Sequence, residues 1–342
     1  MLRTLKRAVK HMPLLAILGV FFGRVLPGLR AYRSILRQCP PEQGWRVYFM
    51  DYAGSGDTYL SCAYLRHRGR IGARDAFAAA GGLSLKIARL FGFGRYMEIR
   101  PRSALTVRMM ERFYGRRLEL LPLLYESDFL EYSGVFRYMG GHRGLDFMSL
   151  LKIGLEANCG LAYEEGPWEQ PQFPCDGTEL DELFRRHALI PGRTVLLAPY
   201  AGKHSLWGIS IDFYQQLARQ LQAEGLTVCT NTCSSSLEPP VPGTVPILVP
   251  HRLARRFCEQ AGCFIGLRSG LCDIVSAAQG CKKVVLSGDM TIPALCASHQ
   301  AFFSLENMGL CRDALELGYD AATGRPDMEI SGIVRWIKGE KV

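Results

Sequence analysis

The sequence predicts an α/β protein with two Rossmann-like domains that face a common cleft. Its 342 residues exceed the size at which a single hydrophobic core usually stops growing. Strand candidates alternate with helical segments, which is typical of parallel sheets covered by helices on both faces. Gly166–Gly177 holds three prolines and two glycines in twelve residues and predicts a linker. We therefore expect a leader over 1–45, a first domain over 46–165, the linker over 166–177 and a second domain over 178–342.

The leader is strongly basic. Residues 1–46 hold nine Lys or Arg against the single acid Glu42, so eight of the nine net positive charges lie there. The rest of the chain is nearly neutral, which argues against a nucleic-acid enzyme with a basic channel.

Apolar residues recur in the leader at helical spacing and predict a basic amphipathic helix. The apolar run Leu14–Phe22 is too short to span a bilayer. We expect residues 1–37 to bind an anionic membrane surface, on the inner face of the plasma membrane. The alternatives are a helix docked on the protein itself and a signal peptide.

The 12 cysteines indicate a reducing compartment. They form no CxxC pair and no Cys/His spacing of a zinc site, and several lie within apolar strand and helix candidates. We expect free thiols in a cytoplasmic protein.

The first domain begins with a strand candidate, Arg46–Tyr52, and a glycine turn, followed by a helix over 58–66. Later elements are less distinct, and we expect helices over 74–91, 103–114 and 145–157 and a strand over 117–121.

The second domain has a clearer pattern. We expect helices over 178–187, 211–223, 251–261 and 269–279, and strands over 194–199, 226–231, 245–249, 263–268 and 283–287. A last helix is expected over 328–338, with a return to the first domain as one option.

Two loops of the second domain are candidates for binding a diphosphate. Ala201, Gly202 and Lys203 follow its first strand, where backbone N–H groups and a lysine would approach phosphate oxygens. The alternative is an ordinary turn, because Gly-Lys pairs are common.

The second loop contains Arg268, Ser269, Gly270 and Asp273 at the start of a helix rich in small residues. We expect Ser269 to be an N-cap, the N–H groups behind it to attract an anion, and Arg268 to contact a phosphate. The alternative is a capped helix with no ligand, in which Asp273 stabilises the first turn by its interaction with the helix dipole.

Asp57 is the candidate general base. It follows the first strand in the turn Gly54-Ser55-Gly56-Asp57, where a carboxylate would accept the proton of an attacking hydroxyl. The alternative is an acid that stabilises the helix start. No Walker loop and no GxGxxG motif occurs, which argues against ATPases and dehydrogenases.

Together, the Gly-Asp turn, the lysine loop and Phe264-Ile265-Gly266 before Ser269-Gly270 resemble the bacterial heptosyltransferase family. These are GT-B enzymes of lipopolysaccharide and capsule biosynthesis. The resemblance covers 46–66 and 190–290.

The resemblance implies roles for individual residues. Asp57 would be the catalytic base in an inverting transfer, and Lys203, Ser269 and Gly270 would face the nucleotide sugar. Members of the family usually have Asp-Ser/Thr-Gly-x-x-His where this chain has Arg268 to Asp273, so the identity of the sugar does not carry over.

The predicted function is a glycosyltransferase that moves a sugar from a nucleotide diphosphate sugar to an envelope glycan or glycolipid. No Asp-x-Asp motif occurs, and we expect neither metal nor cofactor. A nucleotide-sugar epimerase and a non-catalytic glycan-binding protein are the alternatives.

Overall fold

A computed structural model describes the chain over residues 18–51, 54–115, 117–121, 146–166, 168–174, 177–201, 209–232, 238–288, 291–292, 297–320 and 323–340. The chain divides into two compact units. Unit 1 comprises Met1–Glu126 and Ile153–Tyr163, and unit 2 comprises Ser127–Lys152 and Glu164–Val342. The last passage from unit 1 to unit 2, after Tyr163, lies two residues before the predicted linker.

Unit 1 is built on a four-stranded sheet in the order β3-β2-β1-β4, in which all neighbours are parallel. The strands are β1 (Arg46–Met50), β2 (Asp75–Ala80), β3 (Arg95–Ile99) and β4 (Glu119–Leu120). The helices are η1 (Phe21–Val25), α3 (Leu26–Gln38), η2 (Pro41–Gln43), α4 (Ser55–His67), α5 (Gly82–Ala88), η3 (Arg89–Phe91) and α6 (Pro101–Tyr114). Helix α8 (Phe147–Cys159) contributes its later residues to this unit.

The helix predicted over 74–91 is wrong in its first half. Residues 75–80 form β2, and α5 begins only at Gly82; β3 was not predicted at all. The sequence of β2 is Asp-Ala-Phe-Ala-Ala-Ala, and alanine favours helices when nothing else decides. All six residues are buried between β1 and β3, so the tertiary environment overrides the local preference.

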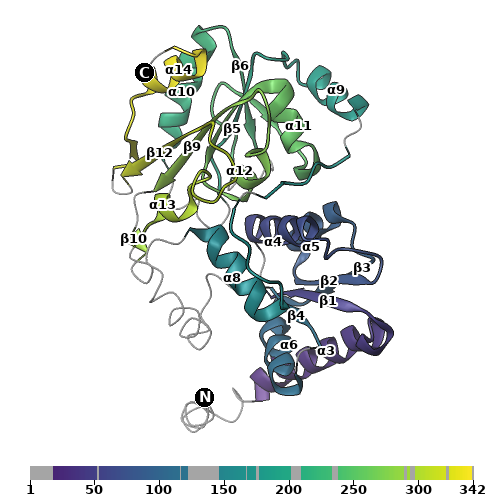
Figure 1. Ribbon diagram of the computed structural model, residues 1–342. Helices are drawn as coiled ribbons and strands as arrows, with labels where there is room; N and C mark the ends of the chain where they lie inside the picture. Colours follow the sequence, from purple (N-terminus) through teal and green to yellow (C-terminus); the bar gives the residue numbers. More distant parts are fainter. Residues whose placement is uncertain are drawn as a thin grey trace. The chain divides into compact units, whose positions relative to one another are not determined.

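Helix α3 is part of the core of unit 1. Its Tyr32 and Ile35 lie in one apolar cluster with Val47 of β1 and Val107 of α6, and Figure 1 shows α3 and α6 together on one face of the sheet, opposite α4 and α5. The docked-helix alternative therefore holds for α3.

The earlier part of the predicted leader helix, residues 1–17, lies outside the described residues. Among those that the structure does describe, no helix is both long enough and apolar enough to cross a bilayer.

Unit 2 contains a seven-stranded sheet in the order β13-β12-β9-β8-β5-β6-β7, parallel except for β13 at its edge. The strands are β5 (Thr194–Ala198), β6 (Thr227–Asn231), β7 (Val245–Ile247), β8 (Gly262–Leu267), β9 (Lys282–Gly288), β12 (Ala314–Asp320) and β13 (Arg325–Pro326); β10 (Thr291–Ile292) pairs with β11 (Ala297–Ser298). The helices are α9 (Gly177–Arg186), α10 (Ile211–Ala223), α11 (His251–Ala261), α12 (Gly270–Val275), α13 (His299–Phe303) and α14 (Ile330–Lys338).

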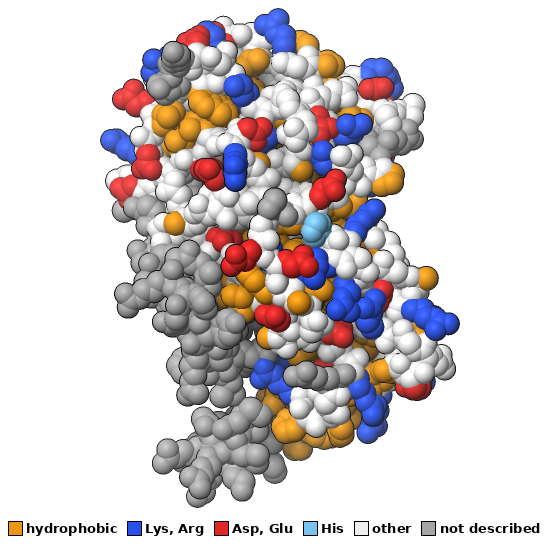
Figure 2. All heavy atoms as spheres, viewed as in Figure 1, with side chains coloured by type: hydrophobic (Ala, Val, Ile, Leu, Met, Phe, Trp, Pro, Cys, Tyr) orange, Lys and Arg blue, Asp and Glu red, His pale blue; other side chains and the backbone are white. Residues whose placement is uncertain are grey.

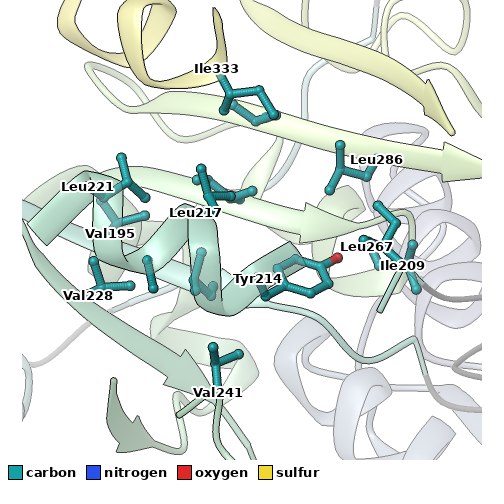
Figure 3. Close-up of a cluster of buried hydrophobic side chains, with 14 of the residues drawn as sticks. Val195, Ile209, Tyr214, Leu217, Leu221, Val228, Val241, Leu267, Leu286 and Ile333 are labelled. Atoms are coloured by element: carbon teal, nitrogen blue, oxygen red, sulfur yellow. The ribbon is translucent and has the colours of Figure 1, made fainter. Parts of the chain in front are cut away.

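The expected strand and helix types of unit 2 are largely confirmed, but β12 and α13 were not predicted. The option that the last helix returns to the first domain is wrong. Ile333 and Val334 of α14 belong to the core of unit 2, together with Leu217 and Leu221 of α10, and Figure 3 shows Ile333 on the same side of the sheet as Leu217. The apolar face of α14 is therefore used within its own unit.

Replacement of Ile333 tests this packing. Ile333 is fully buried, so Ile333→Ala should lower the free energy of unfolding of unit 2 by about 2–5 kcal/mol through lost burial and the cavity left behind. Urea unfolding measures the loss. Leu248→Ala is the control, because Leu248 is 62% exposed and its truncation should change stability by about 0.5 kcal/mol or less. Equal effects of the two variants would contradict the assignment of α14 to this core.

Candidate functional site

Each sheet reverses its strand order beside its first strand. In unit 2 the chain runs from β5 outwards to β6 and β7, then returns to the other side of β5 with β8 and continues to β9 and β12. In open parallel sheets ligands bind at such a reversal, beyond the carboxyl ends of the strands. In unit 2 this position lies between the ends of β5 and β8, where Ala198 is the register partner of Gly266.

Both predicted donor loops begin at this reversal. Ala201 follows β5, and its side chain is buried in the core of unit 2. Gly202 and Lys203 lie outside the described residues. The turn after β8 begins at Arg268, so the pairing of β5 with β8 brings the two loops together at one edge of the sheet.

The guanidinium of Arg268 is engaged inside the protein. Nε donates to the carbonyl oxygen of Phe303 at 2.7 Å, Nη1 donates to that of Ser269 at 2.9 Å, and Nη2 lies 2.6 Å from Oδ1 of Asp273. The charged carbon also lies 5.6 Å from the centre of the Phe303 ring. With the residue 8% exposed, the guanidinium ties the turn after β8 to α13.

Asp273 completes this buried ion pair. Burial raises the pKa of its carboxyl above the ordinary value, although Arg268 acts in the opposite direction. Burial acts to lower the pKa of Arg268, but Asp273, Cys272 and Glu316 together outweigh burial and the pKa is raised. The contacts that the structure describes for Arg268 and Asp273 are with other protein atoms. The contact of either side chain with a donor stays a prediction.

Ser269 occupies the N-cap position of α12 but its hydroxyl makes no capping hydrogen bond. Its Oγ lies 3.9 Å from Sγ of Cys272, and the backbone N–H of Cys272 donates to the carbonyl oxygen of Ser269 at 2.9 Å. Ser269 is therefore the N-cap residue, as expected, but its hydroxyl does not cap the helix. Ser269 and Gly270 are partly exposed at the carboxyl edge of the sheet.

Tyr214 of α10 is a polar residue of this region that sequence reasoning missed. Its side chain is 1% exposed, and its hydroxyl has no hydrogen-bond partner among the residues that the structure describes. Figure 3 shows the hydroxyl directed towards Ile209 and Leu267, at the end of β8. Burial first, and then neighbours including Cys272, raise the pKa of Tyr214. In sequence it is simply one apolar position of an amphipathic helix, so no signal marked it.

Unit 1 has the same arrangement on a smaller scale. The chain runs from β1 to β2 and β3, and β4 returns to the other side of β1. The predicted base, Asp57, lies in the first turn of α4, just beyond the end of β1, and is partly exposed. Gly54 is the N-cap residue and provides no side-chain cap. Asp57 therefore lies at the carboxyl edge of the unit 1 sheet.

A buried ion pair that the sequence did not reveal anchors this turn. Nε of Arg108 on α6 lies 2.5 Å from Oδ2 of Asp51, the residue after β1, and Nη2 donates to the carbonyl oxygen of Leu121 at 2.8 Å. Arg108 is 1% exposed. One guanidinium thus joins the ends of β1 and β4 next to the turn that holds Asp57.

The structure also contains a polar cavity of about 680 Å³ away from these edges, in unit 2. Ser276 and Gln279, before β9, and Cys311 and Asp313, before β12, contribute to its lining. The cavity is therefore at the amino ends of these strands. Gln170, from the predicted linker, also lines it and donates to Oγ of Ser276 at 2.9 Å.

Removal of one charge from the Arg268–Asp273 pair should destabilise unit 2. We expect Arg268→Met to lower the free energy of unfolding by about 3–5 kcal/mol, because it leaves the Asp273 carboxylate buried without its partner. The double variant Arg268→Met/Asp273→Leu should recover much of that loss. Arg252→Met, which removes an exposed ion pair with Glu179, is the control and should cost less than about 1 kcal/mol. Thermal or urea unfolding checks all three; equal losses for Arg268→Met and Arg252→Met would contradict a structural role for the buried pair.

Neither a protein-family model nor a curated protein matches this sequence. Solved structures do match in fold. The ADP-heptose lipopolysaccharide heptosyltransferase II of E. coli superposes with a TM-score of 0.54 at 13% identity, over 86% of this chain and 98% of that chain. A glycosyl transferase family 9 protein of Veillonella parvula superposes with a TM-score of 0.54 at 10% identity, over 86% of this chain and 97% of that chain.

These likenesses extend over nearly the whole length of both solved chains. At such low identity they concern the fold and not the substrates. The predicted fold class is confirmed: the chain has an α/β fold of GT-B type, with one Rossmann-like sheet in each unit.

Proposed function

We propose that the protein is a metal-independent glycosyltransferase that moves a sugar from a nucleotide diphosphate sugar to a hydroxyl of an envelope glycan or glycolipid. One observation carries the proposal: candidate residues follow the first strand of both sheets, at the two strand-order reversals where open parallel sheets bind ligands. The GT-B-type fold is consistent with this use of both units.

The donor belongs to unit 2 in this proposal. Its diphosphate would meet the backbone N–H groups of the Ala201–Lys203 loop and of the Ser269–Gly270 turn, which begin at paired strands. Lys203 would supply the positive charge that a leaving nucleoside diphosphate needs. Arg268 and Asp273 would act indirectly, because their ion pair fixes the turn that presents Ser269 and Gly270.

The acceptor belongs to unit 1. Asp57 would take the proton of the acceptor hydroxyl while that oxygen bonds to the anomeric carbon and the nucleoside diphosphate leaves from the opposite side. Such a single displacement inverts the anomeric centre. The Asp51–Arg108 pair supports this role by fixing the end of β1, from which the turn with Asp57 starts.

The basic leader would bring the enzyme to an acceptor that is bound to a membrane. We propose that residues 1–37 bring the protein to an anionic membrane surface on the cytoplasmic side. Roughly 1 kcal/mol of attraction for each basic residue near such a surface would make this segment sufficient for peripheral binding.

Incubation with a panel of nucleotide sugars tests the reaction class. Release of nucleoside diphosphate that depends on a glycan or glycolipid acceptor supports the proposal. Conversion of the sugar without any acceptor would identify an epimerase, and nucleotide-sugar binding without turnover would identify a binding protein.

Asp57→Asn should reduce turnover by about 10²–10⁴-fold and leave donor affinity almost unchanged, because it removes general-base assistance and no donor contact. Steady-state rates with saturating donor measure the first effect and calorimetry the second. Glu179→Gln is the control, since Glu179 is also an acid in the first turn of a helix, α9, but belongs to unit 2. Near-normal turnover of Asp57→Asn would leave Asp57 as a residue of the helix start only.

Lys203→Ala should weaken nucleoside diphosphate binding by about 1–3 kcal/mol, the scale of a lost charge-assisted hydrogen bond. Calorimetric titration with nucleoside diphosphates measures the change. Lys338→Ala provides a matched loss of charge on α14, where Lys338 pairs with Glu224, and should leave the affinity unaltered. Should both variants bind as tightly as the parent, Lys203 has no part in the donor site.

A further inference from the structure

Helices α3 and α6 form one layer on the unit 1 sheet, and their inward faces are fully used. The two helices approach closely: a Cβ on Gly28 of α3 would lie 2.4 Å from Cβ of Thr106 on α6. Tyr32 donates a hydrogen bond to Glu111 at 3.1 Å, and Ile35 is 1% exposed. The apolar stripe of α3 is therefore occupied by protein, and no other surface can use it.

The outward face of α3 is basic. Arg30, Arg33 and Arg37 are all exposed, and at 100° per residue they lie opposite Gly28, Tyr32 and Ile35 on the helix. Within the described parts of the chain, none of the three forms an ion pair. The ordinary explanation of such a charge run is a solvated helix face.

The neighbouring helix argues against that explanation. α6 exposes Arg102 and Arg112 together with large apolar side chains: Leu105 is 48% exposed and Phe113 61% exposed. Spacings of three, seven and eight residues place these side chains on one stripe, facing away from the sheet. Figure 2 shows orange and blue side chains beside one another where Figure 1 places these helices.

Acidic groups are nearly missing from this layer. Neither η1 nor α3 contains an acid, and α6 contains one, Glu111, which is 3% exposed and accepts hydrogen bonds from Tyr32 and from the backbone of Arg117. Beside the two helices η1 exposes Phe21 and Phe22, at 44% and 61%. Basic and large apolar groups thus share one surface to which η1, α3 and α6 contribute no exposed acid.

We infer that this α3–α6 face is a docking surface for an anionic lipid bilayer; it comprises Phe21, Phe22, Arg30, Arg33, Arg37, Arg102, Leu105, Arg112 and Phe113. Arginines would lie at the lipid phosphates while the aromatic and leucine side chains enter the interfacial region. The surface extends beyond the leader to α6, some 65 residues later in the chain, and it excludes the apolar side of α3. This inference rests on the membrane attachment proposed above and names the surface of unit 1 that would make it; it does not require the transfer reaction.

The bilayer is favoured over a nucleic acid or an acidic protein by the combination of groups. Phosphate recognition alone would use the arginines but would leave Leu105 and Phe113 exposed to water. A membrane interface accommodates both kinds of side chain, because apolar groups enter it beside the charged headgroups. Outside the leader the sequence is almost neutral, so a general attraction to polyanions is not expected.

Point variants must replace truncation in the test. Deletion of residues 1–37 would remove Tyr32 and Ile35 from the unit 1 core, so loss of binding would then report unfolding. In the full chain, Arg30→Gln/Arg33→Gln/Arg37→Gln leaves these core residues intact. We expect this variant to bind vesicles of phosphatidylcholine with 30% phosphatidylglycerol about 100-fold more weakly than the parent, at low salt and without nucleotide sugar.

The matched control removes three exposed arginines from unit 2: Arg185→Gln/Arg219→Gln/Arg335→Gln. It has the same net charge as the test variant and should bind the vesicles within a few-fold of the parent. Equal binding by the two triple variants, whether both are weak or both resemble the parent, would overturn the proposal.

A second variant tests insertion without altering charge. In Phe113→Trp, brominated lipids should quench the added tryptophan fluorescence on vesicle binding, whereas Leu248→Trp, at an exposed position of unit 2, should show no added quenching. Vesicle binding without quenching at position 113 would overturn the docking geometry. Binding of the parent to a single-stranded oligonucleotide but not to the vesicles would assign the face to nucleic acid and would also overturn the proposal.

Discussion

A parallel sheet brings the carboxyl ends of all its strands to one edge, and a reversal of strand order leaves the two central ends uncovered by a connecting helix. Both units obey this constraint, at β1 and β4 in unit 1 and at β5 and β8 in unit 2. The positions of the candidate residues follow from it. Asp57 and Ser269 are far apart in sequence, but each lies one turn beyond a central strand of its sheet.

Each reversal is held by a buried arginine paired with an aspartate. Arg108 binds Asp51 and the carbonyl oxygen of Leu121, and Arg268 binds Asp273 and the carbonyl oxygen of Phe303. A planar guanidinium satisfies several acceptors from separate segments at once, which suits it to joining loops that leave neighbouring strands. Burial of these charges costs solvation energy, and the benefit to the fold is a defined geometry of the turns.

The sequence was most informative where local pattern and burial agree, as in unit 2, where α10 and α11 begin and end at the predicted residues. It failed for β2, because only its two neighbouring strands make an alanine-rich segment extended. The structural role of Arg268 could not be inferred from the sequence either. Its partners Phe303 and Met308 lie 35 and 40 residues away, in a segment that has no recognisable motif. An arginine in a turn has the same sequence signal whether it faces a phosphate or a carbonyl group.

Helix α6 connects the two proposals for unit 1. Its inward Arg108 holds the end of β1 and hence the start of the turn with Asp57, while Leu105 and Arg112 on its outward side belong to the proposed bilayer surface. A rigid helix with both functions would fix the height of the candidate base above a membrane. Such a constraint is useful when the acceptor is a lipid-linked glycan, because the reacting hydroxyl is then at a set distance from the headgroups. Unit 1 would thus combine acceptor chemistry and membrane attachment, and unit 2 would be left to bind the nucleotide sugar.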